Sequence, residues 1–381
     1  MSEAMIPYGR QSISEGDIQA VINVLQSDFL TQGPIVPKFE RAVADYCQAL
    51  HGVAANSATS ALHIACLALN VRPGDYVWTS PITFVASANC AAYCGAHIDF
   101  VDVDPETGNL SVPALTQKLI SAEREGVLPK VVIPVHLSGE PCDMEALWQL
   151  GQRYGFHIVE DASHAIGARH KSSPVGSCIF SDITVFSFHP VKIITTAEGG
   201  LAVTNDADLA RRMQLFRTHG ITKEVSEMSL PSPMPWYYEQ VCLGFNYRMT
   251  DVQAALGLSQ LNRLDKFVEK RLQVAAIYDR LLGDHVDVPR RDPANRSAMH
   301  LYIVRVEDRD GVFRGMRAAG VGVNVHYIPV YKQPWYQRLG AYAELPGAEK
   351  FYARCLSIPM FPSITSLQQA QVATALIDLV P

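Results

Sequence analysis

The feature that most constrains the fold is an alternation of short apolar runs with longer helical patterns between residues 76 and 159. The helical patterns occupy residues 84–94, 112–125 and 144–154. Strands without a polar face are typical of a parallel sheet that helices cover on both sides. We therefore expect an α/β protein whose ligands bind at the carboxyl ends of the strands. The predicted strands are Tyr76–Thr79, Ile98–Val101, Val131–Val135 and His157–Val159.

Two charged residues follow predicted strands of this sheet. Asp161 comes directly after the strand that ends at Val159, and Lys192 follows a strand predicted at Ile183–Phe188. A lysine amine forms a Schiff base with the aldehyde of pyridoxal phosphate, and a buried carboxylate pairs with the protonated nitrogen of its ring. Most lysines are solvated surface charges, so Lys192 alone would indicate little. Together the two residues predict a pyridoxal phosphate site.

A third segment has the geometry of a phosphate site. A strand predicted at residues 52–55 enters Asn56-Ser-Ala58-Thr59, which opens a helix through Leu69. The first turn of a helix presents free amide groups and a positive dipole end, and both attract a phosphate. A plain Ser/Thr helix cap is the alternative interpretation of the same residues.

These motifs combine into a family pattern. Asp161-x-x-His164, Ser187-x-His189-x-x-Lys192 and Thr195-Thr196-Ala-Glu198-Gly-Gly200 resemble the sugar-nucleotide aminotransferases of the pyridoxal-phosphate fold-type-I superfamily. The resemblance runs from Tyr8 nearly to the C-terminus. It implies a large, mostly parallel sheet domain with helices on both faces and a smaller C-terminal α+β domain.

We place the large domain at residues 1–260 and the smaller domain at residues 261–381. A single long helix, capped by Thr250 or Asp251 and running through Val268, is expected to bridge them. The smaller domain is predicted to hold strands at Leu301–Val306 and Val323–Tyr327 and helices at Val312–Ala319 and Leu367–Leu379.

The resemblance also implies site residues for the cofactor, pyridoxal 5'-phosphate. Lys192 and Asp161 would be catalytic, and the turn at Ala58 and Thr59 would hold the phosphate. Phe84 would stack on the pyridine ring of the cofactor, although a phenylalanine usually lies in the hydrophobic core. His164 would make a polar contact with the cofactor, or else a structural hydrogen bond. The implied cofactor-binding residues are Ala58, Thr59, Phe84, Asp161, His164, Ser187, Lys192 and Asn246.

The implied substrates are a UDP-keto-sugar and L-glutamate as the amino donor. Within the family, the likeness is to members that act in pseudaminic acid biosynthesis, which implies amination at C4 of a UDP-linked 6-deoxy sugar. The alternative acceptor is another UDP- or dTDP-4-keto sugar, either a pentose or a D-hexose. Asn246 would reach the partner's site, which implies a homodimer with shared active sites. The implied substrate-binding residues are Tyr8, Asp28, Phe29, Leu30, Thr31, Ala58, Ser187, Asn246, Val325, His326 and Tyr327.

Three rival interpretations are less favoured. Dehydratase relatives carry a histidine at the lysine position, whereas this chain has Lys192. Amino-acid transaminases of similar fold match the Ser-x-His-x-x-Lys pattern less well. A non-catalytic regulator would not need Asp161, Lys192 and the phosphate turn together. One departure from the family is Ile193, where close relatives often carry proline.

Composition narrows the class of protein further. A net charge of −6 argues against nucleic acid as a partner, because phosphate backbones require basic surface. No apolar run approaches the roughly 20 residues that span a bilayer. The eight cysteines are scattered, without metal-ligand spacing. We therefore expect a cytoplasmic enzyme that binds neither membrane nor metal.

Overall fold

The central sheet confirms the predicted α/β class. The computed structural model describes residues 5–230, 234–340 and 342–380. Within these residues the sheet has the strand order β1-β9-β8-β5-β4-β2-β3, and only β9 runs against the others. Its strands are β1 (His51–Ala55), β2 (Tyr76–Thr79), β3 (His97–Phe100), β4 (Val131–Ile133), β5 (His157–Asp161), β8 (Ile183–Ser187) and β9 (Gly200–Thr204).

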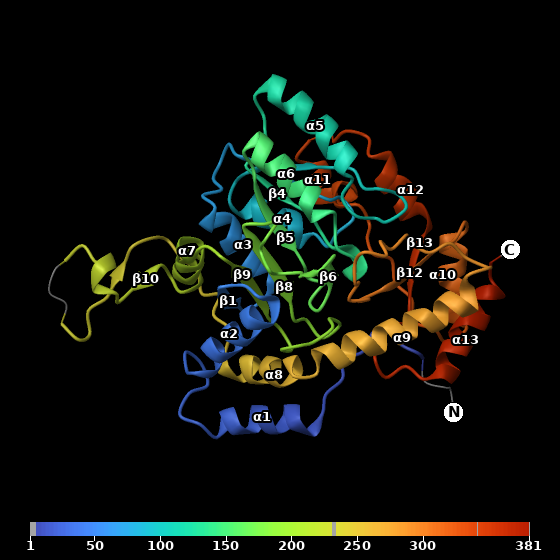
Figure 1. The fold of residues 1–381 in the computed structure, drawn as a ribbon, viewed down its shortest axis with the longest axis horizontal. Helices are drawn as coiled ribbons and strands as arrows, with labels where there is room; N and C mark the ends of the chain where they lie inside the picture. Colours follow the sequence, from blue (N-terminus) through green and yellow to red (C-terminus); the bar gives the residue numbers. More distant parts are fainter. Residues whose placement is uncertain (1–4, 231–233, 341, 381) are drawn as a thin grey trace.

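Helices cover both faces of this sheet, as Figure 1 shows. Side chains at alternate positions of each strand point to opposite faces, so each strand contributes to two cores. On β8, Val185 packs with α3 (Ala58–Ala68), α4 (Ala86–Tyr93) and α7 (Ala207–Arg217). Phe186 packs on the other face with α2 (Ile35–Cys47) and α8 (Asp251–Leu261). Farther along this second face lie α5 (Val112–Glu125) and α6 (Met144–Tyr154).

A separate core lies toward the C-terminus. Its elements are α10 (Arg309–Ala318), α13 (Ser366–Ile377) and the antiparallel pair β12 (Tyr302–Arg305) and β13 (Cys355–Ile358). The helix α9 (Leu264–Leu282) connects the two parts, with Val268 in the sheet core and Tyr278 in the C-terminal core. Ile6 also packs in the C-terminal core, so the N-terminal segment crosses to this part. We propose a division near residue 260, with α9 as the link.

Shorter elements complete the description. The helix α1 (Glu15–Leu25) packs against α8. Two short features, the pair β6 (Arg169–His170) and β7 (Ser173–Pro174) and the 3₁₀ turn Leu137–Gly139, also belong to the large part. The segment that contains β10 (Ile221–Thr222), β11 (Glu239–Gln240) and the turn Val225–Glu227 projects from the body in Figure 1. The C-terminal part adds α11 (Pro334–Gln337), α12 (Pro346–Arg354) and the turn Val330–Lys332.

Two predicted elements are wrong. The single long helix is two helices, because Arg263 leaves helical geometry (φ −111°, ψ 2°) and its side chain forms an ion pair with Asp17. The strand predicted at Val323–Tyr327 is reduced to one bridge between Asn324 and Ser357. There the Asn324 Oδ1 accepts a hydrogen bond from the N–H of Val325, 2.9 Å away. Such a local side-chain bond competes with a strand ladder.

The other strand and helix predictions differ from the structure by a few residues at most, and α5 and α6 match their predicted ranges. No helix among the described residues is both long enough and apolar enough to cross a membrane.

Candidate active site

A cavity of about 520 Å³ lies where β5 and β8 end, beneath residues of the C-terminal part. Its position agrees with the rule that open α/β sheets bind ligands at the carboxyl ends of their strands. Many of the predicted site residues line it, namely Tyr8, Ala58, Thr59, Phe84, Asp161, His164, Ser187, Lys192, His326 and Tyr327. The structure therefore brings together residues that are spread over most of the chain.

Lys192 lies in the loop between β8 and β9. The Lys192 N–H donates to the carbonyl of His189 (2.9 Å), and the Thr195 hydroxyl donates to the carbonyl of Phe188 (2.9 Å). These bonds fold the loop into a compact turn at the cavity. Loss of contact with bulk water lowers the pKa of the Lys192 amine to about 8, although the nearby charge of Asp161 opposes this shift. About a tenth of the amine is therefore unprotonated, and thus nucleophilic, at pH 7, far more than for an ordinary lysine.

Asp161 ends β5 and is buried, and both oxygens of its carboxylate are held. Oδ1 accepts a hydrogen bond from the N–H of Ser163 (3.1 Å), and Oδ2 accepts one from the hydroxyl of Ser87 (2.6 Å). Ser87 is in turn hydrogen-bonded to the hydroxyl of Thr83 (2.7 Å). The sequence places Ser87 beside Phe84 but carries no signal that it reaches Asp161. Ser87 is thus a site residue that the sequence analysis missed.

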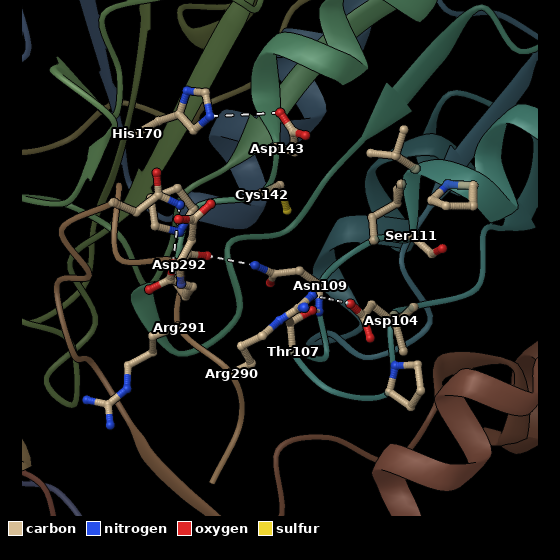
Figure 2. Close-up of a pocket in the computed structure, with 18 of the residues that line it drawn as sticks. Asp104, Thr107, Asn109, Ser111, Cys142, Asp143, His170, Arg290, Arg291 and Asp292 are labelled. Atoms are coloured by element: carbon tan, nitrogen blue, oxygen red, sulfur yellow. Dashed lines mark hydrogen bonds and ion pairs between the residues drawn. The ribbon is translucent and has the colours of Figure 1, made fainter. Parts of the chain in front are cut away.

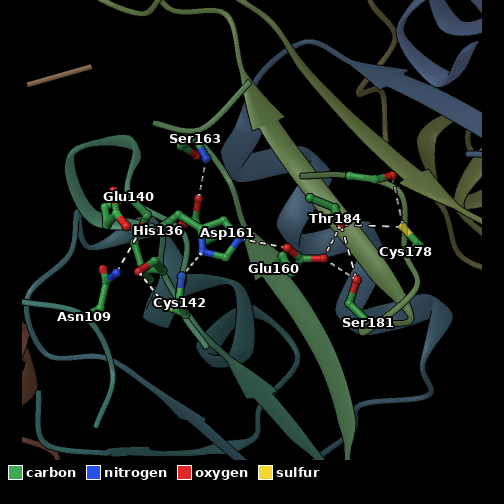
Figure 3. Close-up of polar contacts among 12 residues, drawn as sticks. Asn109, His136, Glu140, Cys142, Glu160, Asp161, Ser163, Cys178, Ser181 and Thr184 are labelled. Atoms are coloured by element: carbon green, nitrogen blue, oxygen red, sulfur yellow. Dashed lines mark hydrogen bonds and ion pairs between the residues drawn. The ribbon is translucent and has the colours of Figure 1, made fainter. Parts of the chain in front are cut away.

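A second buried carboxylate stands next to Asp161 on the same strand, and Figure 3 shows its contacts. Glu160 accepts hydrogen bonds from the Nε2 of His136 (2.7 Å), the hydroxyl of Thr184 (2.8 Å) and the hydroxyl of Ser181. The N–H of Cys142 donates to the Nδ1 of His136 (3.1 Å), which places the imidazole proton on Nε2. Burial alone would raise the pKa of Glu160, but its donors hold the pKa below the ordinary value. This network fixes the end of β5.

Substitution of Ser87 by alanine should lower kcat about tenfold or more, because hydrogen bonds to charged groups contribute roughly 1.5–3 kcal/mol. Cofactor affinity, measured by absorbance titration, should fall as well. Ser80→Ala is a matched control, since Ser80 is also buried and its hydroxyl has no partner among the described residues. Equal effects of the two substitutions would mean that the Ser87–Asp161 bond has no functional role.

The amino end of α3 opens toward the same cavity. Ser57 caps the helix by accepting a hydrogen bond from the N–H of Ser60 (3.1 Å), while Ala58 and Thr59 line the cavity. The strand β9 passes so close that a Cβ on Gly200 would lie 2.4 Å from the nitrogen of Ala58, so glycine is required there. Backbone amides of a first helical turn at a cavity form an anion site.

The opposite side of the cavity carries aromatic rings. Phe84 is 60% exposed, which is unusual for a phenylalanine and leaves its ring free to stack on a planar ligand. The ring of Tyr327 lies 6.5 Å from that of Phe84, measured between centroids. An amine, a held carboxylate, an anion site and an exposed aromatic ring around one cavity fit pyridoxal phosphate.

The C-terminal part supplies cavity residues that the sequence analysis did not identify. Both His300 and Asn324 line the cavity. Asn324 directly precedes the predicted segment Val325–Tyr327, so its position could have been suspected. His300 sits in an apolar stretch without any pattern that separates it from an ordinary core histidine.

Other predicted site residues lie outside this cavity. The segment Asp28–Thr31 is exposed, as is Asn246, and Val325 packs with an apolar cluster to which both parts of the chain contribute. The segment Asp28–Thr31 lies against the start of α8, because Thr31 pairs with Thr250 and the N–H of Asp251 donates to the carbonyl of Leu30 (2.9 Å). Asn246 pairs with Thr218, so both predicted contributors are held by other contacts. Within one chain they do not contribute to the site.

A larger cavity, of about 730 Å³, lies between the loops before α5 and α6 and the segment 290–295. Figure 2 shows its polar lining. Its cations are already paired: Arg290 with Asp104 (3.0 Å), Arg291 with Asp279 (2.6 Å) and Lys171 with Glu145 (2.5 Å). None of the predicted site residues lines it. The chemistry therefore points to the smaller cavity.

Comparison with known proteins identifies the family to which the chain is related. The model of the DegT/DnrJ/EryC1/StrS aminotransferase family matches residues 11–377. The spore coat polysaccharide biosynthesis protein SpsC of Bacillus subtilis is 36% identical over 98% of this chain and 97% of its own length. A UDP-4-amino-4,6-dideoxy-N-acetyl-beta-L-altrosamine transaminase of Campylobacter jejuni is 36% identical over 93% of this chain and 92% of its own.

Solved structures show the same relationship. Helicobacter pylori PseC, described as an aminotransferase of pseudoaminic acid biosynthesis, superposes with a TM-score of 0.90 and 31% identity, over 99% of both chains. A Streptococcus pneumoniae protein solved in a PLP form superposes with a TM-score of 0.88 and 29% identity, over 98% of both chains.

Proposed function

Because this chain belongs to the DegT/DnrJ/EryC1/StrS aminotransferase family and is a sugar aminotransferase that uses pyridoxal phosphate, we propose a specific reaction for it. The enzyme transfers the amino group of L-glutamate to C4 of UDP-2-acetamido-2,6-dideoxy-β-L-arabino-hexos-4-ulose. The product is the 4-amino sugar used for pseudaminic acid. Two relatives support the proposal: the Campylobacter jejuni protein is named as a transaminase of this amino sugar, and the Helicobacter pylori protein is described as an aminotransferase of pseudoaminic acid biosynthesis.

The observation that carries the transamination step of this proposal is the meeting of Lys192, Asp161 and the amino end of α3 at one cavity. Bound pyridoxal phosphate supplies an aldehyde that carries the amino group and a ring that accepts the electrons of the substrate carbon. Asp161 provides the carboxylate for the protonated ring nitrogen, and Ser87 and Ser163 hold that carboxylate in place. The buried position of the carboxylate strengthens this pairing, because the local dielectric is low.

Lys192 has two roles in this proposal. Its amine anchors the cofactor, and after release it removes a proton from the substrate carbon of the donor. In the second half of the reaction it returns a proton to C4 of the sugar. The lowered pKa of the amine, about 8, suits a group that alternates between base and acid near neutral pH.

The sugar would lie between the cofactor and the C-terminal part. Tyr8, His326 and Tyr327 line this side of the cavity, and the Tyr8 ring lies 5.7 Å from the His326 ring. Tyr8 offers an apolar surface to the C6 methyl group of a 6-deoxy sugar. We assign Leu30, which lies outside the cavity of its own chain, to the same role in the partner's site.

We further propose a homodimer in which each active site takes residues from both chains. The exposed segment Asp28–Thr31 and Asn246 would complete the partner's cavity, since neither reaches the cavity of its own chain. Large apolar side chains are exposed nearby in sequence, including Phe29 at 53%, Trp236 at 72% and Leu243 at 80%. Apolar side chains of this size that gather into one exposed patch are typical of a surface that another chain covers.

The substrate assignment predicts a ranking of kcat/KM among three acceptors with glutamate as donor. The proposed L-arabino sugar should exceed a UDP-4-keto-pentose and a D-configured 4-keto-hexose. The expected margin is modest for the pentose, since apolar contacts with one methyl group contribute only about 1–3 kcal/mol. Mass spectrometry should identify each amino-sugar product. A tenfold preference for either alternative, equivalent to about 1.4 kcal/mol, would replace the proposed substrate.

A further inference from the structure

The C-terminal part makes a direct hydrogen bond to a residue of the cofactor side of the cavity. The Tyr327 hydroxyl lies 3.0 Å from the Nε2 of His164. The two rings are nearly parallel, with an interplanar angle of 21° and centroids 6.0 Å apart. His164 follows β5, three residues after Asp161, whereas Tyr327 belongs to a segment 163 residues farther along the chain. This bond therefore joins the two halves of the site.

The other side of His164 is backed by a second ring. The His300 ring centroid lies 4.4 Å from that of His164, and both histidines are buried. The stretch that carries His300 is itself held by Arg271 of α9, whose Nη1 donates to the carbonyls of His300 (3.0 Å) and Met360 (3.1 Å). His164 is thus confined between a ring and a hydroxyl that are both fixed by the C-terminal part.

Both members of the Tyr327–His164 pair are uncharged. Burial, reinforced by the charge of Lys192, holds the pKa of His164 well below its ordinary value, and burial raises the pKa of Tyr327. In a neutral pair the phenol is the stronger acid and the imidazole nitrogen the stronger base. We therefore assign the Tyr327 hydroxyl as the donor and Nε2 as the acceptor, which leaves the imidazole proton of His164 on Nδ1, a buried atom without a hydrogen-bond partner among the described residues.

We propose that Tyr327 is a positioning residue that fixes both the ring orientation and the tautomer of His164 at the cofactor site. The role of Tyr327 at the cofactor rests on the proposed function, because that function includes the contact between His164 and the cofactor. The hydrogen bond between Tyr327 and His164 does not depend on it. It assigns to Tyr327 a role on the cofactor side, in addition to the substrate contact expected from the sequence. Because the Tyr327–His164 hydrogen bond joins the two parts of the chain, cofactor affinity would also depend on the position of the C-terminal part relative to the large sheet.

The test compares Tyr327→Phe with Tyr331→Phe. Tyr331 is a matched control from the same part of the chain, because its hydroxyl donates to Glu349 (2.5 Å) and it does not line the cavity. The first readout is the tautomer of His164 in protein stripped of cofactor, from ¹⁵N-histidine NMR, with the signal assigned by its loss in His164→Gln. In the wild-type protein and in the Tyr331→Phe variant, the imidazole of His164 should carry its proton on Nδ1. Tyr327→Phe should shift it toward Nε2, the form that free histidine prefers.

The second readout is the affinity of the stripped protein for pyridoxal phosphate, measured by quenching of tryptophan fluorescence. Tyr327→Phe should weaken it about threefold to tenfold, as expected for the loss of one hydrogen bond. Melting temperatures should show that both variants are folded. An unchanged tautomer in Tyr327→Phe would overturn the proposal, and so would an equal loss of affinity in Tyr331→Phe. A shifted tautomer with unchanged cofactor affinity would overturn the role at the cofactor.

These outcomes are separable from the proposed reaction. The tautomer is measured without any sugar or amino donor, so it does not depend on which substrate the enzyme uses. If the acceptor panel contradicted the proposed substrate, the Tyr327–His164 result would still stand. Conversely, an unchanged tautomer would leave the substrate assignment untouched.

Discussion

Replacing Lys192 with alanine should abolish transamination while leaving the protein folded. The substitution removes both the amine that anchors the cofactor and the group that moves the proton. General acid–base catalysis alone contributes about 10²–10⁴-fold, and loss of the anchor adds to this. The remaining site, with the Ser87–Asp161 hydrogen bond of 2.6 Å and the amides of α3, should still bind pyridoxamine phosphate. Turnover with glutamate and absorbance titration measure the two effects.

A chemical label tests the same assignment independently. The wild-type enzyme should be yellow, and borohydride treatment should fix the cofactor to a peptide that contains Lys192. Lys171→Ala is the matched control, because Lys171 is an exposed lysine paired with Glu145 (2.5 Å) outside the site. That variant should keep its color, its label and its activity. A label on any lysine other than Lys192 would reject the assignment.

Local motifs explain why the center of the site could be predicted. Asp161 and Lys192 each follow an apolar strand, and parallel strands end at the same edge of a sheet, so a short pattern is enough to bring them together. The covered sheet could be predicted for a similar reason, since its strands lack a polar face. In both cases the information lies within a few neighboring residues.

Contacts between distant segments could not be predicted in this way. Ser87 meets Asp161 across 74 residues, and a serine at the start of a helix carries no signal of such a contact. His300 gives no periodic or spacing cue either, because its position depends on Arg271 holding the carbonyls around it. At the break between α8 and α9, Arg263 leaves helical geometry and its side chain pairs with Asp17, which lies far away in sequence. Tertiary contacts decide these features.

The residues that fall outside the cavity raise a different point. Asp28–Thr31 and Asn246 match the family pattern as well as the cavity residues do, yet they lie exposed outside the cavity of the single chain. Apart from a family pattern, a sequence gives no indication of which subunit's site a residue serves. The proposed shared site accounts for both segments at once, and it can be tested directly.

Mixing inactive Lys192→Ala and Asn246→Asp chains should restore activity. In the hybrid dimer one site carries both lesions, and the other combines an intact Lys192 with an intact Asn246 from the opposite chain. Random exchange of equal amounts makes half of the dimers hybrid, so about a quarter of the wild-type activity is expected. Each variant alone should stay inactive. Lys192→Ala lacks the amine that anchors the cofactor, and in Asn246→Asp a carboxylate would repel the cofactor phosphate that Asn246 is proposed to contact in the partner's site.

The control for this experiment pairs two lesions on the same side of the interface. Lys192 and Asp161 line one cavity of one chain, so a hybrid of Lys192→Ala with Asp161→Asn has one lesion in each of its sites. No recovery is expected from that mixture. Hybrids can be isolated with a different affinity tag on each chain, which proves that exchange has occurred. If the isolated hybrid of Lys192→Ala with Asn246→Asp has no activity, Asn246 does not serve the partner's site. If activity recovers in the control hybrid, Lys192 and Asp161 do not act in the same site of one chain.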